Sequence, residues 1–171
     1  MTSVKRLQRE LTKLNSGPLA PGISLVSAEN LQEWLMDIQV MDDNPIYMGK
    51  TFRLKFVFSQ NYPIGMATIN ADGTNLVLIP TTEAPEVVFL RTPNREIPMH
   101  PHVYSNGIIC LDLLSSQGWS PVQNVESTSL SIQSMLTGNT KNERPPGDDE
   151  FVRTNRLRPR DVNFVFHDKH V

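Results

Sequence analysis

Cys110 is the only cysteine of the chain, and His100 and His102 precede it closely. A cysteine in such a setting permits three interpretations: a buried thiol that packs as a small apolar group, a metal ligand, or a nucleophile. Residue type alone favours the buried thiol, because free cysteines are among the most buried side chains. The three residues lack a fourth ligand and do not follow the usual spacing of zinc ligands, so we expect no bound metal.

The composition narrows the classes of protein that this chain can be. Its 171 residues, of which 39% are hydrophobic, suffice for one buried core, and we expect a single domain over residues 1–171. A formal net charge of -2 argues against a nucleic-acid-binding protein, and no apolar run reaches the roughly 18 residues of a membrane span. The single cysteine and the absence of a signal-peptide pattern predict a soluble protein of the cytoplasm and nucleus.

Two segments have the features of amphipathic helices. The first carries four apolar residues at helical spacing: Val4, Leu7, Leu11 and Leu14. The second follows a capping-box pattern from Ser120 to Gln123, in which Pro121 suits the first helical position. We therefore expect a helix from this box to about Leu136, where Gly138 can end it.

Alternation of apolar and polar residues predicts several strands in the first half of the chain. The clearest is residues 51–58, where phenylalanines and a leucine alternate with other residues at the period of a half-buried strand. Residues 34–41 and 85–90 are further candidates, and consecutive strands of this kind form a meander. Residues 64–84 hold two apolar runs around Asp72-Gly73, which predicts either an extra hairpin or a disordered excursion.

The order of short motifs around Cys110 resembles the active-site signature of ubiquitin-conjugating enzymes. His-Pro at 100–101, Gly107, Cys-Leu-Asp at 110–112 and Trp-Ser-Pro at 119–121 occur in the family's order. The strings KRLQREL, NPIYMGKTFRLKFVFSQNYP and PEVVFL look like the family's first helix and its second, third and fourth strands. The resemblance implies an α+β fold, with a four-stranded antiparallel meander sheet, an N-terminal helix, a central helix after the active-site loop, and short C-terminal helical segments.

The resemblance further implies that Cys110 accepts ubiquitin from the activating enzyme as a thioester and passes it to substrate amines. A thiol suits this role, because its thiolate is a strong nucleophile and the thioester stays reactive toward amines. This chain would then need no cofactor of its own. Gly107 would permit a close backbone approach beside the cysteine. Four residues at or near family positions are expected to support the active site: His100, Asp112, Trp119 and Glu143.

His102 departs from the family pattern, which usually has asparagine after His-Pro. The resemblance implies that this asparagine supports the oxyanion or orders the loop, so either His102 replaces it as a donor or the acceptor chemistry differs. His-Pro-His and the string VYSNGIICL look like the W-type branch, whose members modify the α-amino group of flexible substrate N-termini. Near pH 7.2, about 20% of α-amines but under ~0.1% of lysine side chains are neutral, so an N-terminus needs less help to lose its proton.

The resemblance also indicates surfaces for partners. Lys5 and Arg9 on the first helix are typical of a solvated face, yet they match positions that contact the activating enzyme and ligases of the RING or U-box type. Three further residues match part of the ligase-binding surface: Ile64, Ser120 and Pro121. The enlargement at residues 64–84 either alters the choice of ligase or lies away from that contact.

The C-terminal tail is the remaining candidate for a substrate contact. We expect residues 156–171 to be mobile or only partly ordered, with Phe164 and Phe166 as candidates for binding substrate N-termini. Two alternatives to the enzyme stay open: a non-catalytic module that keeps the fold for interactions, and a carrier of another ubiquitin-like modifier. The intact string GIICLD disfavours the first, because such modules characteristically lack the cysteine.

Overall fold

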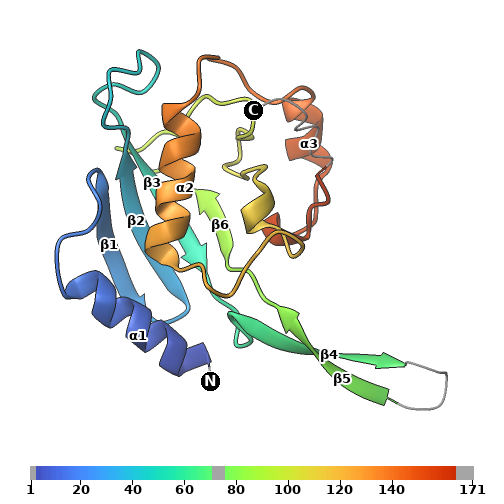
Figure 1. The fold of residues 1–171 in the computed structure, drawn as a ribbon. Helices are drawn as coiled ribbons and strands as arrows, with labels where there is room; N and C mark the ends of the chain where they lie inside the picture. Colours follow the sequence, from blue (N-terminus) through green and yellow to red (C-terminus); the bar gives the residue numbers. More distant parts are fainter. Residues whose placement is uncertain (1–2, 71–75, 165–171) are drawn as a thin grey trace.

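The computed structural model describes residues 3–70 and 76–164 (Figure 1). Its elements, in chain order, are α1 (Ser3–Asn15), β1 (Ile23–Asn30), β2 (Glu33–Gln39), β3 (Thr51–Val57), β4 (Ile64–Asn70), β5 (Leu76–Thr82), β6 (Glu86–Phe89), the 3-10 helix η1 (Asp112–Leu114), α2 (Val125–Thr137), α3 (Asp148–Thr154) and the 3-10 helix η2 (Pro159–Asp161). Strands β1, β2, β3 and β6 form one antiparallel sheet in that order, which confirms the expected α+β fold with a four-stranded meander. Among the described helices, none combines the length and the apolar character that crossing a membrane requires.

The main sheet buries the apolar side of its strands beneath helix α2, which lies across one face (Figure 1). In β3, Phe52, Leu54 and Phe56 are fully buried and alternate with partly exposed residues, so the strand predicted from alternation is confirmed. Opposite them in register are three buried residues of β2: Ile38, Met36 and Trp34. Periodicity does not locate β1, because its burial does not alternate regularly along the strand.

Helix α2 begins later than the capping box at Ser120 predicts. Its N-cap is Asn124, whose side chain accepts the Ser127 N–H at 3.0 Å, while the Ser127 hydroxyl accepts the Asn124 N–H at 2.9 Å. Residues 120–123 form a turn instead. The prediction of the helix start was therefore wrong, whereas its end at Gly138 is confirmed.

Side chains of α1 explain the later start of α2. In a helix beginning at Pro121, the Val125 N–H would donate to the Pro121 carbonyl. Here Arg6 donates to the carbonyls of Pro121 at 3.0 Å and Gln123 at 2.6 Å, and Glu10 accepts the Val125 N–H at 3.1 Å. Because both groups already have partners on α1, the first turn is unwound and the helix begins at Val125.

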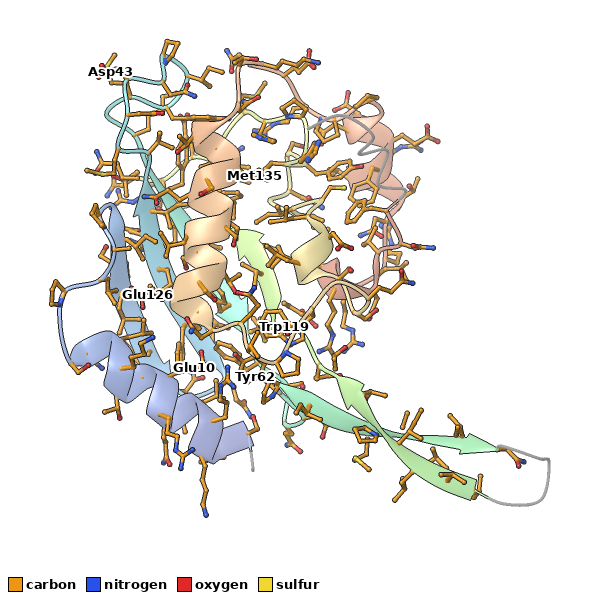
Figure 2. The ribbon with its side chains drawn as sticks, in the orientation of Figure 1. Glu10, Asp43, Tyr62, Trp119, Glu126 and Met135 are labelled. Carbon is orange, nitrogen blue, oxygen red and sulfur yellow. The ribbon has the colours of Figure 1, made fainter. Side chains whose placement is uncertain are left out.

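The Glu10 carboxylate is buried and joins α1 to the segment that precedes β4. It accepts a hydrogen bond from the Tyr62 hydroxyl at 2.7 Å and forms an ion pair with Arg6. Burial, and then the charge of Glu10, raise the pKa of Tyr62 far above its usual value, so the hydroxyl stays a donor. The Tyr62 ring lies 6.0 Å from the ring of Trp119, and Figure 2 shows these side chains gathered between α1 and the start of α2.

Strands β4 and β5 form a separate hairpin that projects away from the main sheet (Figure 1). Of the two alternatives for residues 64–84, the structure has the hairpin, while its tip at residues 71–75 lies outside the described residues. The base is fixed on the core, because the Glu83 N–H donates to the Pro63 carbonyl at 2.9 Å and the Glu83 carboxylate pairs with Arg160 at 2.6 Å. The described part of the C-terminal tail thus packs on the core, with Val162 buried.

Replacing Glu10 with alanine should lower the free energy of unfolding by roughly 3 kcal/mol, because the Tyr62 hydroxyl and Val125 N–H lose their acceptor and Arg6 loses its counter-ion. Denaturant titration measures this change. Glu96→Ala is the matched control, since its exposed ion pair with Lys50 should contribute less than ~1 kcal/mol. Equal effects of the two substitutions would contradict the structural role assigned to Glu10.

Candidate active site

Strand β6 positions the segment that carries the cysteine. The Phe89 N–H donates to the Gly107 carbonyl at 2.9 Å, and Val88 forms a bridge with Ile108. Gly107 has a φ of +93°, and a Cβ there would lie 2.0 Å from the Phe89 carbonyl oxygen. Only glycine fits this contact, which agrees with the close backbone approach expected beside Cys110.

Cys110 lies partly exposed just before the short helix η1. Its backbone N–H donates to the His102 carbonyl at 2.8 Å, and Val103 forms a bridge with Ile109. The two histidines and the cysteine, eight residues apart at their nearest, are therefore brought together by backbone pairing within one loop. Cys110 is partly exposed rather than buried, which contradicts the interpretation as a fully buried apolar group.

His100 is 5% exposed and is held as a neutral ring. Its Nδ1 accepts the backbone N–H of His102 at 2.9 Å, so Nε2 carries the proton and donates to the Met135 carbonyl of α2 at 3.2 Å. Burial, and then the neighbouring His102, lower the pKa of His100 to about 4, although the Met135 carbonyl opposes this change. His100 thus ties the active-site loop to α2.

His102 is fixed through its backbone on both sides, by His100 and by Cys110. Its ring is partly buried, and the centroids of the two imidazoles are 5.4 Å apart with an angle of 78° between the planes. Among the described residues, no hydrogen bond to the His102 side chain is present. The position of the ring is set by these backbone contacts and by its packing against the His100 ring.

Arg144 is a support of this loop that sequence reasoning missed. Its guanidinium donates to the carbonyls of Ile97, Pro98 and Val103, all in the segment that precedes the cysteine. Tyr47 adds a further contact, because its hydroxyl donates to the Met99 carbonyl at 2.6 Å. No sequence pattern indicates these contacts, since they depend on carbonyls whose direction is set by the folded loop.

An aromatic cluster stands close to the cysteine. The rings of Tyr104 and Phe151 stack with centroids 3.9 Å apart, and the Phe164 ring is 6.0 Å from Tyr104. The Tyr104 N–H donates to the Ile108 carbonyl at 2.9 Å, two residues before Cys110. Burial, followed by the charges of Cys110 and Asp148, raises the pKa of Tyr104. The structure thereby brings Phe164 near the site, whereas Phe166 lies outside the described residues.

The other predicted supports occupy different environments. Trp119 is buried in the core, and Asp112 is exposed in the first turn of η1, where it accepts the Ser115 hydroxyl at 3.4 Å. Glu143 is exposed, and its carboxylate lies 3.9 Å from Lys141. Asp148 is the acidic residue whose charge acts on Tyr104, and it accepts the Ser105 N–H at 2.8 Å.

The predicted partner residues lie on elements that contact one another. Lys5 and Arg9 are exposed on α1, and Ile64 is exposed at the start of β4. Ser120 and Pro121 are partly exposed in the turn that Arg6 of α1 holds. The Thr82 hydroxyl also donates to the Ser116 carbonyl at 3.1 Å, which joins the hairpin base to the segment before this turn.

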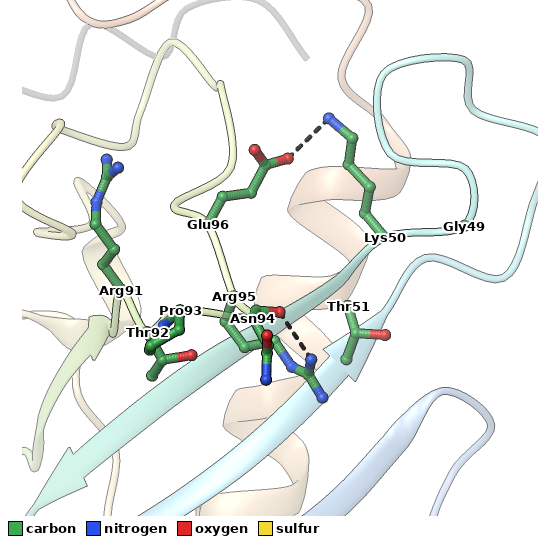
Figure 3. Close-up of a pocket in the computed structure, with 9 residues that line it drawn as sticks. All are labelled: Gly49, Lys50, Thr51, Arg91, Thr92, Pro93, Asn94, Arg95 and Glu96. Atoms are coloured by element: carbon green, nitrogen blue, oxygen red, sulfur yellow. Dashed lines mark hydrogen bonds and ion pairs between the residues drawn. The ribbon is translucent and has the colours of Figure 1, made fainter.

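A polar hollow of about 540 Å³ lies at the opposite end of β3 from the hairpin (Figure 3). Two of its charged side chains are paired: Lys50 with Glu96 at 2.8 Å, and Arg95 with Asp37, which lies outside the lining, at 2.8 Å. It contains neither Cys110 nor the histidines, so it is separate from the candidate active site. Within residues 3–70 and 76–164, no three His, Cys, Asp or Glu side chains are grouped to hold a metal ion.

Comparison with known proteins gives consistent similarities. The family model described as ubiquitin-conjugating enzyme matches residues 6–163. A Dictyostelium discoideum protein named probable ubiquitin-conjugating enzyme E2 W is 40% identical over 171 residues, which cover 98% of each chain. A Danio rerio protein named probable ubiquitin-conjugating enzyme E2 W-A is 37% identical over 96% of this chain and 95% of its own. The crystal structure of ubiquitin conjugating enzyme E2 UbcA1 from Agrocybe aegerita has a TM-score of 0.76 and 38% identity, covering 92% of this chain and 97% of that chain.

The buried His100 should make stability depend on pH. Its pKa is about 4 in the folded protein against 6.5 for a histidine exposed to water, so its contribution is fully present above pH 6.5 and is lost as the pH falls toward 4. Between pH 7 and pH 5 this loss should be about 2 kcal/mol. Denaturant titrations of wild type and His100→Gln at both pH values measure it. If the variant loses as much stability as wild type over this interval, His100 is not the responsible group.

Proposed function

The chain belongs to the ubiquitin-conjugating enzyme family, and we propose that it carries ubiquitin as a thioester on Cys110 and transfers it to the α-amino group of a substrate's N-terminus. Enzymes of this family work with ubiquitin, an activating enzyme and ligases. The observation that carries the proposal is the accessible Cys110 in a loop whose backbone is fixed by β6, His100 and Arg144. We further propose that the enzyme acts in the cytoplasm and nucleus, where a lone thiol stays reduced.

Two exchanges at the Cys110 sulfur make up the reaction. In the first, the Cys110 thiolate attacks the carbonyl carbon of ubiquitin's C-terminal thioester on the activating enzyme, whose own thiolate leaves. In the second, a neutral amine attacks the new thioester, loses a proton and forms an amide as the Cys110 thiolate leaves. The energy of the amide bond comes from the activating enzyme, so no cofactor is required on this chain.

His102 is proposed to act on the oxyanion that forms during amine attack. Backbone contacts hold His102 in the loop that carries Cys110, and its ring has no hydrogen-bond partner among the described residues. An imidazole N–H can donate to an oxyanion as the usual asparagine amide does. Near neutral pH an α-amine is often already neutral and can attack directly, whereas a lysine side chain must first lose a proton. An active site with histidine instead of asparagine at position 102 is therefore expected to suit N-termini better than lysine.

The aromatic cluster supports the proposed substrate class. Tyr104, Phe151 and Phe164 form a partly exposed apolar wall, and Tyr104 is bonded through its backbone to Ile108, two residues before Cys110. A flexible N-terminal segment could lie against such a wall while its α-amine reaches the thioester. We therefore propose that Phe164, with Phe166 beyond it in sequence, contacts substrate.

We also propose roles for the predicted partner residues. Lys5 and Arg9 on α1 would contact the activating enzyme and ligases, which makes the two interactions mutually exclusive. Three residues would contact RING or U-box ligases: Ile64, Ser120 and Pro121. The proximity of these elements supports a common surface, because Arg6 holds the turn that contains two of them.

Acceptor choice gives the direct test of the proposal. Incubated with activating enzyme, ATP and ubiquitin, the protein should form an adduct that reductant removes, and Cys110→Ser should give one that reductant does not remove. The loaded enzyme should then modify a lysine-free peptide with a free, flexible N-terminus faster than it is discharged by free lysine, as measured by mass spectrometry. Strong lysine discharge without peptide product would refute the acceptor claim.

The loading step also tests the two alternative functions. Loading with another ubiquitin-like protein but not with ubiquitin would favour the alternative modifier, and no loading at all would favour a non-catalytic module.

Substitution of His102 separates its two proposed roles. His102→Ala should slow transfer to the peptide N-terminus about 100-fold once the thioester is formed, because the oxyanion loses its donor. His102→Asn should retain transfer, since the amide also donates. Single-turnover discharge of preloaded enzyme measures both rates. A full rate for His102→Ala would rule out the donor role and leave only the loop-ordering one.

A further inference from the structure

The β4–β5 hairpin exposes large apolar side chains that no described element covers. The register pairs Met66 with Pro80, Thr68 with Leu78, and Asn70 with Leu76, so these residues share the face that begins at Ile64. We call Ile64, Met66, Pro80, Leu78 and Leu76 the Ile64 face. Four of them are strongly exposed: Ile64 at 53%, Met66 at 56%, Leu78 at 63% and Leu76 at 76%. Contiguous exposed apolar residues of this kind mark interaction surfaces.

The base of the hairpin is fixed although its faces are bare. Glu83 is held by the Ser59 hydroxyl at 3.0 Å and by Arg160 at 2.6 Å, and Thr82 donates to the Ser116 carbonyl at 3.1 Å. These contacts fix the direction in which the strands leave the core. A surface held in place before binding loses less conformational entropy when a partner docks.

The composition of the hairpin disfavours a membrane as the occupant. Residues 64–82 contain no lysine or arginine, and Asp72 is their only charged residue. The stretch from Asn70 to Asn75, between the two strands, is largely polar in sequence. Surfaces that enter a lipid interface combine an apolar leading part with basic residues. An uncharged, two-stranded ribbon with open edges instead suits an apolar protein surface.

The Ile64 face continues the proposed ligase contact, and this continuity indicates which kind of protein docks on it. Ile64 belongs both to that contact and to the Ile64 face, and the base of the hairpin is bonded to the segment that leads to Ser120 and Pro121. A ligase seated on these residues would have the Ile64 face running outward beside it. A second copy of this chain would instead have to cover Ile64 and thereby compete with the ligase.

We propose that the Ile64 face docks against a RING-type ligase, and that it selects ligases whose surface beside the RING domain is apolar and uncharged. The inference rests on the proposed function, because it extends the ligase contact of the same enzyme. A ligase with charged groups beside its RING domain would bury them against the Ile64 face, where they would lose their hydration without gaining a partner. The hairpin would therefore weaken the binding of such a ligase and strengthen the binding of one with an apolar surface.

Adjacent residues on opposite faces of β5 provide a matched test. Leu78→Glu places a charge on the Ile64 face, whereas Val77→Glu places the same charge on the other face, where Val77 is 42% exposed. A panel of isolated RING domains is titrated against the unloaded protein by calorimetry, and each RING domain is also tested for stimulated discharge of the loaded enzyme. For at least one RING domain, we expect Leu78→Glu to weaken binding and stimulation about tenfold or more and Val77→Glu to change them less than about twofold.

The controls separate docking from folding and from catalysis. Thermal unfolding should be similar for both variants, and discharge without ligase should equal that of wild type. A second variant, in which residues 66–80 are replaced by a short turn, should lose the same RING partner. Because calorimetry uses unloaded protein, a failure of thioester formation would refute the proposed function without deciding the docking result.

Three results would overturn the inference. Equal losses for Leu78→Glu and Val77→Glu would show that the hairpin has no selective face. RING domains that bind all variants alike would show that the hairpin lies outside the ligase contact. A wild-type dimer that Leu78→Glu dissociates in sedimentation experiments, with RING binding unchanged, would assign the face to a second copy of the chain.

Discussion

The buried carboxylate of Glu10 is the interaction on which the partner-facing end of the molecule depends. It binds the Val125 N–H at the start of α2, the Tyr62 hydroxyl before β4, and Arg6 on its own helix. Arg6 in turn holds the turn that contains Pro121. A buried charge must have partners on all sides, and here those partners come from three separate segments. The relative positions of α1, the hairpin base and α2 follow from satisfying one carboxylate.

The active-site loop is organised by backbone hydrogen bonds rather than by a catalytic array of side chains. Gly107 lets the loop approach β6, and His100 attaches the loop to α2. Arg144 donates hydrogen bonds to carbonyls of the loop, including that of Val103. The imidazole of His100 is neutral because burial disfavours its charged form, and a neutral ring can accept and donate at the same time. The catalytic roles of the thiol and of the His102 side chain are proposals that rest on this arrangement of the loop.

The hairpin extends the fold without disturbing it. Strands β3 and β6 pair in register on either side of the inserted residues, because lengthening the connection between two paired strands adds only a small entropic cost. The apolar surface of the hairpin lies outside the main core, so packing against the main sheet does not bury it. Among the described residues, the hairpin adds exposed apolar surface, and the hydrogen bonds and ion pair that join its base to the core involve Ser59, Ser116 and Arg160 rather than Cys110.

Local patterns in the sequence determined α1, β3 and the end of α2, whereas the expectation of a close backbone approach at Gly107 came from the family resemblance. Each of these three elements depends on residues close together in the chain, through periodicity or capping. The spacing of motifs around Cys110 likewise identified the family before any geometry was known. The start of α2 could not be read in this way. The capping box at Ser120 is locally favourable, but Arg6 and Glu10, more than a hundred residues earlier, take the groups that its first turn needs.

Only the tertiary structure shows the contacts of Arg144, the position of Asp148 near Tyr104, and the exposure of the Ile64 face. Arg144 serves carbonyls that become neighbours only when the loop closes, and Tyr104 meets Phe151 only because α3 folds back toward the cysteine. The apolar runs around Asp72-Gly73 predicted either a hairpin or a disordered excursion, and only the structure shows a hairpin with exposed apolar residues on both faces. Sequence patterns report local preferences, whereas burial and the partners of polar groups are properties of the complete fold.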